Sequence, residues 1–332
     1  MDAFLFAEWL GKPAWMWVGI FSFVFALLVL DLGVLNRGAK VIEARRSLML
    51  AGMYMAIGLG FGGFVWWQLG PRSGLEYITG YVVEWSLAMD NLFVIAMIFA
   101  YLRIPREYQH RVLFWGIIGV IVLRGIMIGL GATLVTRFSW VLYVFAAFLV
   151  FTGVKMLMFA GKDEDIGENP LLGFLRRRMR VTEGVRGQKF FVREPDPKTG
   201  NVVLFATPLF LALCLVEVAD VIFAVDSVPA IFAITTDVYI VYTSNIFAIL
   251  GLRALFFALS AMMHRFAYLK QALAVLLMFI GGKVFAADLL GLGKFPAEIS
   301  LSVTFAILGA GVAWSLFKTR GERPPEQLRG EA

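Results

Sequence analysis

Long apolar runs are the feature that most constrains how this chain folds. A helix needs about 20 apolar residues to cross a membrane, and nine such runs follow one another in the sequence. Hydrophobic residues make up 60% of the chain and charged residues only 16%, an excess that a soluble core cannot bury. The sequence therefore predicts an all-α polytopic membrane protein in contact with the lipid bilayer. The expected spans are 14–35, 47–68, 76–101, 111–134, 139–160, 207–233, 238–262, 268–290 and 297–317.

Basic residues are concentrated in alternate connections between the expected spans. They occur in the first, third, fifth and seventh connections and in the C-terminal tail, whereas the others carry at most one each. Lys and Arg in short loops stay in the cytoplasm. We therefore expect an integral inner (cytoplasmic) membrane protein with its N-terminus outside and its C-terminus in the cytoplasm. The net charge of +6 does not indicate nucleic-acid binding, because the basic residues that produce it lie in these connections.

The fifth connection, residues 161–206, is the only long one. Its segment "QKFFVREPDPKTGNVVLF" has two β-prone runs around a turn rich in Pro, Asp and Gly, which predicts a small β-hairpin. This cytoplasmic loop is where we expect a partner of a stress complex, or a second copy of the chain, to bind.

An internal repeat relates spans three to five to spans six to eight. "EWSLAMDNLFVI" (84–95) aligns with "DVIFAVDSVPAI" (220–231), and F-x-G-x-K recurs at 151–155 and 279–283. Each half has three spans, so the second half must be inserted upside down, as in inverted-repeat transporters that bind substrate near the midplane. The matched pairs are Asp90 and Asp226 (136 residues apart), Arg124 and Arg253 (129), and Lys155 and Lys283 (128).

The repeat divides the chain into five parts. We expect an N-terminal two-helix scaffold, the first three-helix repeat, the cytoplasmic loop, the inverted second repeat, and a C-terminal helix with its tail. Their ranges are 1–75, 76–160, 161–206, 207–290 and 291–332.

The acids, amides and hydroxyls within the repeats offer oxygen atoms as metal ligands and include no sulfur or imidazole ligand. Carboxylates in a membrane are costly and mark functional sites, and oxygen ligands suit Mg²⁺, Ca²⁺ or Mn²⁺. The candidate metal ligands are Glu84, Asp90, Asn91, Glu217, Asp220 and Asp226. The candidate charge partners and neighbours are Arg124, Arg253, Lys155, Lys283, Ser227 and Asn245. The alternative is that the basic residues neutralise the acids in structural ion pairs.

Asp226 requires a change in its helix to join this set. It lies nine residues after Glu217, about 180° around a regular helix. Pro229 cannot donate to the carbonyl of Val225, so we expect span six to kink or unwind around 225–228 and to turn Asp226 inward.

Other classes of site find little support in the sequence. The single cysteine, Cys214, excludes an intrachain disulfide, and two histidines do not suggest a zinc or copper site. The sequence contains no nucleophile–base pair and no nucleotide loop, so we expect no enzyme activity and no cofactor other than a bound or transported cation.

The two repeat motifs resemble the paired signatures of TerC family integral membrane proteins. "VEWSLAMDNLFV" and "DVIFAVDSVPAIFAITTD" carry the resemblance, and the long charged loop after "FTGVKM" is most similar to the Alx-type members. The resemblance implies a nine-helix, LysE-like architecture and a link to manganese efflux or tellurite resistance. It also implies that the six candidate ligands form the metal site.

These observations favour a divalent metal-ion transporter that exports Mn²⁺ from the cytoplasm through a midplane carboxylate site, with Ca²⁺ or Mg²⁺ as other candidate ions. One alternative is a membrane scaffold or a component of tellurite or metal-stress resistance, in which the acids are structural. Another is an exporter of a different small solute or ion, such as Ca²⁺ or an amino acid.

Overall fold

The structure is a computed structural model that describes residues 6–30, 44–158, 170–195, 200–259, 269–291 and 295–319. Within these ranges, eight helices are long and apolar enough to cross a membrane. They are α3 (Ala44–Leu69), α4 (Pro71–Tyr101), α5 (Arg106–Arg137), α6 (Val141–Met158), α8 (Pro208–Phe232), α9 (Val238–Leu259), α10 (Leu269–Leu289) and α11 (Ala297–Lys318). The shorter apolar helix α2 (Ala14–Leu30) precedes them. The predicted all-α polytopic fold is confirmed.

Four helices of the two repeats form the centre of the molecule. α4 packs against α9, α5 packs against α8, and α4–α8 and α5–α9 are also in contact. Exchanging α4 with α8 and α5 with α9 turns the α4–α9 pair into the α5–α8 pair and leaves the α4–α8 and α5–α9 pairs unchanged. The helix contacts therefore have the pseudo-two-fold relation that an inverted repeat requires.

The third pair of repeat helices, α6 and α10, meets at two glycines. A Cβ on Gly153 of α6 would lie 2.6 Å from the carbonyl oxygen of Ala274, and a Cβ on Gly281 of α10 would overlap the carbonyl oxygen of Ala146. Small residues let membrane helices approach closely. Both contacts join residues at the same repeat offset, because Gly281 follows Gly153 by 128 residues and Ala274 follows Ala146 by 128.

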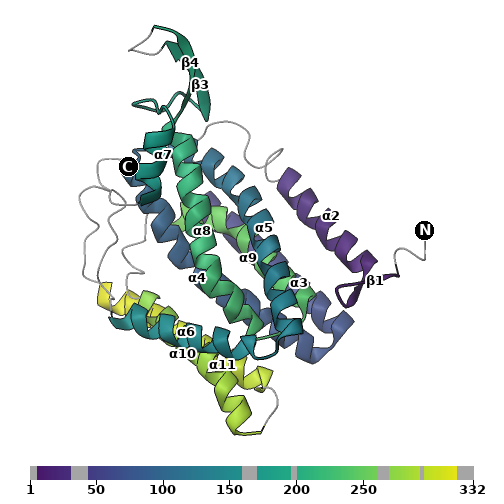
Figure 1. Cartoon of the computed structure of the whole chain (residues 1–332). Helices are drawn as coiled ribbons and strands as arrows, with labels where there is room; N and C mark the ends of the chain where they lie inside the picture. The colour runs from purple at the N-terminus through teal and green to yellow at the C-terminus, as the bar shows by residue number, and fades with distance from the viewer. Residues whose placement is uncertain are drawn as a thin grey trace.

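The remaining helices surround this centre. α3 packs against α9 and α4, and α11 packs against α10 and α4. Figure 1 shows α6, α10 and α11 together at one side of the bundle and α2 at another. The main buried cluster lies between α3, α4 and α9, where Phe61, Tyr77 and Phe247 are in contact.

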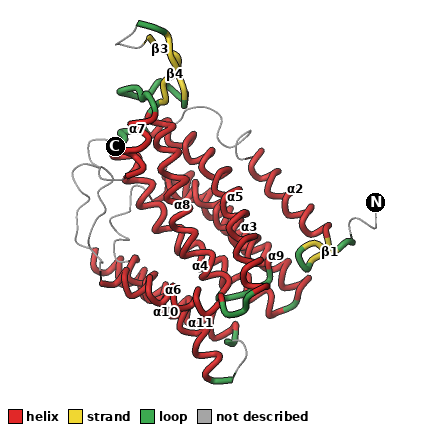
Figure 2. The backbone as a smooth tube through the Cα atoms, viewed as in Figure 1, coloured by secondary structure: helices red, strands yellow, loops and turns green. Residues whose placement is uncertain are grey.

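The predicted β-hairpin is present in the fifth connection. β3 (Phe191–Pro195) pairs antiparallel with β4 (Val202–Ala206), and the short helix α7 (Pro170–Arg178) precedes it. Figure 2 shows the hairpin projecting beyond one end of the helices. α8 begins two residues after β4, which identifies the opposite end of the bundle as the one where α8 ends and α9 begins.

A second hairpin, at the N-terminus, was not predicted. β1 (Glu8–Trp9) pairs with β2 (Lys12–Pro13) across Leu10 and Gly11, which have φ angles of 50° and 78°. Positive φ at both central residues is the requirement of a type I′ hairpin turn. Trp17 of α2 donates from its indole nitrogen to the Trp9 carbonyl at 2.8 Å and fixes the hairpin to the helix.

Candidate functional site

A buried arginine between two carboxylates lies at the centre of the repeats. Arg124 of α5 donates from Nε and Nη2 to the two carboxylate oxygens of Asp220 of α8, at 3.2 and 3.0 Å. Its Nη1 contacts Glu84 Oε1 of α4. Arg124 is 3% exposed and Glu84 1% exposed, so the group is shielded from solvent by protein. The guanidinium fork suits this two-sided arrangement because its donors lie in one plane.

The repeat explains why these acids meet. Glu84 and Asp220 occupy corresponding positions, 136 residues apart, on α4 and α8. These two helices contact each other near the pseudo-two-fold axis. Each half therefore contributes one carboxylate to the same place, and Arg124 of the first half reaches both.

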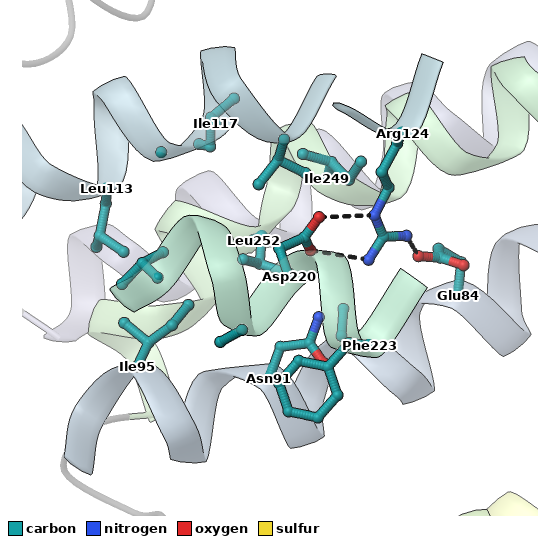
Figure 3. Close-up of a pocket in the computed structure, with 15 residues that line it drawn as sticks. Glu84, Asn91, Ile95, Leu113, Ile117, Arg124, Asp220, Phe223, Ile249 and Leu252 are labelled. Atoms are coloured by element: carbon teal, nitrogen blue, oxygen red, sulfur yellow. Dashed lines mark hydrogen bonds and ion pairs between the residues drawn. The ribbon is translucent and has the colours of Figure 1, made fainter. Parts of the chain in front are cut away.

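A small cavity of about 30 Å³ extends from the ion pair along α5. Figure 3 shows the two carboxylates at the guanidinium and the apolar side chains of Ile95, Leu113 and Ile117 toward the other end. A buried water needs roughly 10–15 Å³ and two to four polar partners. The polar end of the cavity, lined by Glu84, Asn91, Arg124 and Asp220, therefore has room for a water or a dehydrated ion.

Several buried polar atoms of the candidate residues have no hydrogen-bond partner within the described part of the chain. Such atoms are rare, because most buried polar groups are paired with protein or water. Most of them are oxygens, the ligand atoms that hard cations prefer. They are Glu84 Oε2, Asn91 Oδ1, Glu217 Oε2, Ser227 Oγ, and Oδ1 and Nδ2 of Asn245.

Glu217 lies against α5 next to this group. A Cβ on Gly119 would overlap the Glu217 carboxylate, which shows how closely that carboxylate approaches the α5 backbone. Glu217 precedes Asp220 by three residues on α8 and therefore lies on the same face. The sequence did not single out Gly119, although its place near Arg124 on one helix was visible.

Asp226 is not among the residues that line the cavity. The predicted unwinding of 225–228 is wrong, because α8 is helical through Pro229 to Phe232. Pro229 lies close to the end of the helix, where losing one backbone hydrogen bond does not stop it. The α8 residues that line the cavity are Val216, Ala219, Asp220 and Phe223, and Asp226 is half-buried outside this lining.

Two of the candidate residues lie outside what the structure describes in atomic detail. Asp90 and Arg253 belong to α4 and α9, but their side chains are not among the described ones. Among the side chains that are described, no group of three or more His, Cys, Asp or Glu residues is arranged to hold a metal ion. The described carboxylates meet Arg124 instead, and the six-ligand site stays a prediction.

The two repeat lysines do not approach the carboxylate pair. Lys155 of α6 is exposed. Lys283 of α10 is 6% exposed and donates to Ser300 Oγ of α11 at 2.8 Å, in a separate cavity. Of the three basic candidates whose side chains the structure describes, Arg124 is the one that lies against the acids.

The fold and this site define the chain as a multi-pass integral membrane protein with a buried ion-pair site between two related halves. The chain belongs to the TerC family of integral membrane proteins, whose family model matches residues 69–323. The predicted family is confirmed.

Similar proteins cover almost the whole chain. A Myxococcus xanthus protein named "Uncharacterized membrane protein STKORF319" is 47% identical over 93% of this chain and 94% of its own. An Escherichia coli (strain K12) protein named "Putative membrane-bound redox modulator Alx" is 44% identical over 90% of this chain and 92% of its own. A Rickettsia bellii (strain RML369-C) protein named "Uncharacterized membrane protein" is 46% identical over 91% of this chain and 97% of its own. No solved structure matches the chain.

Proposed function

We propose that the chain is a transporter that exports a divalent cation, with Mn²⁺ as the first candidate, through the site around Glu84 and Asp220. The observation that carries the proposal is that Glu84 and Asn91, each with an unpartnered buried oxygen, line a cavity of about 30 Å³ together with Asp220. In a membrane protein, buried ionisable groups of this kind are associated with ion pathways.

Charge balance supports a divalent substrate. Glu84, Glu217 and Asp220 carry three negative charges when ionised, and Arg124 supplies one positive charge. The remaining charge of −2 is what one divalent cation compensates. Carboxylate and amide oxygens are the ligands of Mn²⁺, Mg²⁺ and Ca²⁺, and they do not distinguish strongly among the three.

The Arg124 guanidinium and the cation compete for the same carboxylates, those of Glu84 and Asp220. In the state described here, the guanidinium pairs with Oε1 of Glu84 and with both carboxylate oxygens of Asp220. A cation arriving through the cavity replaces the arginine at one or both carboxylates, and the arginine returns when the cation leaves. The acids then keep a counter-charge at both stages, which limits the cost of holding them away from water.

Direction and location follow from the distribution of basic residues. We place the chain in the inner membrane with β3–β4 and the C-terminus in the cytoplasm. Transport from the cytoplasm outward then begins at the apolar end of the cavity, near Ile95 and Leu113, and leads to Arg124. In this proposal the chain catalyses no chemical reaction.

The pairing of Arg124 with both Glu84 and Asp220 favours one second candidate. In a membrane scaffold the same group is a structural ion pair, and the working surface is the projecting α7–β3–β4 segment. A redox function of the kind named for the Escherichia coli relative requires a redox group, and one cysteine, Cys214, cannot form an intrachain disulfide.

Manganese flux in proteoliposomes separates these candidates. Wild-type protein is expected to move Mn²⁺, and Glu84→Gln and Asp220→Asn are each expected to lower the initial rate at least about tenfold, because each removes a charged ligand. Asp288→Asn, at an exposed acid, serves as the matched control and keeps the wild-type rate. Normal flux in both site variants, with normal protein levels, contradicts the proposal and favours the scaffold.

A further inference from the structure

A second and larger cavity lies at the end of the bundle opposite β3–β4. Its volume is about 270 Å³. It is enclosed by the first turns of α4 and α11, the last turns of α10, and the turns that join α5 to α6 and α8 to α9. This volume is far above the roughly 10–15 Å³ that one water needs, so a small organic molecule fits.

Lys283 is the charged group buried in its wall. The residue is 6% exposed, and its one hydrogen bond within the described chain goes to Ser300 Oγ. An ammonium has three donors, so two remain for a ligand. No carboxylate oxygen of the described residues lies within 4 Å of Lys283 Nζ, so no ion pair compensates its charge. A buried cation without a counter-charge is costly.

The nearest acid in the wall is already paired. Glu76, 8% exposed, accepts from Arg72 Nε at 3.1 Å. Glu76 also acts electrostatically on Lys283, but it makes its ion-pair contact with Arg72, so Lys283 has only part of a counter-charge. Asp288, the other acid of the wall, is exposed at the end of α10. The buried part of the cavity therefore favours a negatively charged ligand.

Two hydroxyl groups of the cavity wall add donors, and one of them, that of Ser300, contacts the ammonium. Ser300 Oγ accepts from Lys283, and Thr235 Oγ1 accepts from the Asp237 backbone N–H at 3.2 Å. Each keeps its own proton for an acceptor. Lys283 Nζ and Ser300 Oγ are 2.8 Å apart, a spacing at which the two oxygens of one carboxylate accept one bond from each.

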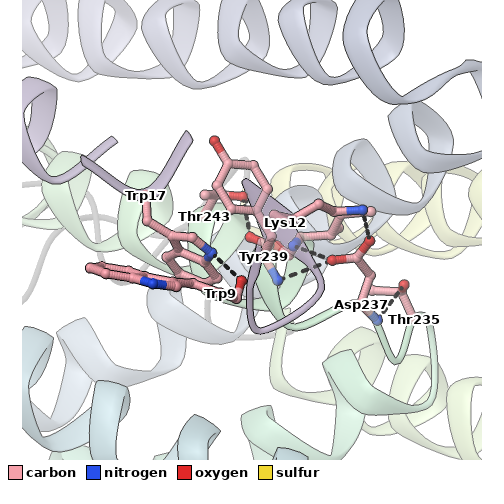
Figure 4. A network of polar contacts seen from close by, with 8 residues as sticks. Trp9, Lys12, Trp17, Thr235, Asp237, Tyr239 and Thr243 are labelled. Carbon is pink, nitrogen blue, oxygen red and sulfur yellow. Dashed lines mark hydrogen bonds and ion pairs between the residues drawn. The ribbon is translucent and has the colours of Figure 1, made fainter. Parts of the chain in front are cut away.

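The turn that carries Thr235 is held in place from outside the repeats. Lys12 of the N-terminal hairpin pairs with Asp237 at 2.8 Å, and the other carboxylate oxygen of Asp237 accepts from the Tyr239 N–H at 3.0 Å. Figure 4 shows Lys12 and Thr235 on either side of Asp237. This wall of the cavity is therefore fixed before a ligand arrives.

We propose that this second cavity binds a small planar monovalent anion of the carboxylate type, such as formate, acetate or bicarbonate, with the Lys283 ammonium as its counter-charge. The ligand accepts hydrogen bonds from Lys283, Ser300 and Thr235. The site is separate from the Arg124 group, and its existence does not depend on cation transport.

Anion binding to the purified protein tests this site. Radiolabelled formate is measured by scintillation proximity, and thermal unfolding is followed by tryptophan fluorescence in formate, acetate, bicarbonate or chloride at constant ionic strength. Wild-type protein is expected to bind formate saturably and to unfold at a higher temperature as the oxyanions are raised. Chloride, which lacks paired oxygens, is expected to have a weaker effect. Equal effects of all four anions, or no saturable binding, overturn the proposal.

Variants assign the binding to the cavity. Lys283→Met is expected to weaken formate binding about tenfold or more, because a charge-assisted hydrogen bond is lost. Lys155→Met is the matched control, since Lys155 holds the same place in the first repeat but is exposed, and it binds as wild type does. Unchanged binding in Lys283→Met overturns the proposal.

Two further variants keep the test decisive if Lys283→Met fails to fold. Thr235→Val removes a hydroxyl donor but leaves the charge, and it is expected to weaken formate binding severalfold. Glu76→Gln removes the competing acid and is expected to strengthen binding. Loss of binding in Glu76→Gln, or no change in Thr235→Val, contradicts the arrangement proposed here.

Discussion

At the scale of single residues, Arg124 determines the state of the site. Its guanidinium contacts one carboxylate from each repeat, Glu84 and Asp220, and all three side chains are buried. Buried ion pairs of this kind contribute little net stability, but removing one partner leaves an uncompensated charge. The arginine therefore holds the two halves together for as long as both acids stay ionised.

Replacing this arginine is expected to destabilise the protein strongly. Arg124→Met leaves two buried carboxylates without a counter-charge, so we expect the free energy of unfolding to fall by about 3–5 kcal/mol. Chemical denaturation of the detergent-purified protein measures this free energy of unfolding. Arg137→Met, at an exposed arginine on the same helix, is the control and changes it little. A triple variant that adds Glu84→Gln and Asp220→Asn is expected to recover much of the loss. A Met variant as stable as wild type contradicts this account.

At the scale of elements, the α6–α10 contact depends on two glycines at equivalent places in the repeats. Gly153 and Gly281 let the backbone of one helix touch the backbone of the other. A side chain at either position meets a carbonyl oxygen, which cannot move aside as a flexible side chain can. The neighbouring Gly282 faces open space.

Adjacent glycines of α10 therefore respond differently to substitution. Gly281→Ala is expected to separate the two helices and to lower the thermal unfolding temperature by several degrees. Gly282→Ala is expected to leave it unchanged or to raise it slightly, because alanine favours helix by up to about 1 kcal/mol over glycine in this setting. The difference between the two unfolding temperatures is the measurement. Equal behaviour of the two variants shows that the contact is not tight.

Most elements could be predicted from the sequence because they depend on local composition. The span predicted at 207–233 is α8, Pro208–Phe232, and the β3–β4 hairpin lies within its predicted loop. The site could be predicted only in part. The internal repeat places Glu84 and Asp220 at matching positions of spans three and six. It does not show which of the four basic residues contacts them. Nor does it show that a proline near a helix end leaves the helix intact.

At the scale of the whole molecule, the two ends of the bundle differ in character. One end carries α7 and the β3–β4 hairpin, and the other carries the N-terminal hairpin and the second cavity. The connections rich in Lys and Arg lie at the end that carries α7 and the β3–β4 hairpin, and we propose that this end faces the cytoplasm. The membrane then separates the second cavity from the hairpin.

Single cysteines test this orientation. In a Cys214→Ser background, Val202→Cys on β4 and Leu290→Cys after α10 introduce thiols at positions that are both 67% exposed. We expect a membrane-impermeant maleimide added to intact spheroplasts to label Leu290→Cys and to label Val202→Cys only after the membrane is opened. Labelling of Val202→Cys in sealed spheroplasts contradicts the orientation.

The ion pair between Lys12 and Asp237 has a consequence for how the chain is made. The ribosome synthesises the N-terminal hairpin first, yet its partner follows more than two hundred residues later, after α2 through α8. Until then, Lys12 has no Asp237 to contact. Closure of this pair marks the moment in biosynthesis when α8 has crossed and the turn before α9 has reached the correct side. In a chain in which α8 fails to insert, the N-terminal hairpin keeps its contact with α2 but does not form the ion pair with Asp237.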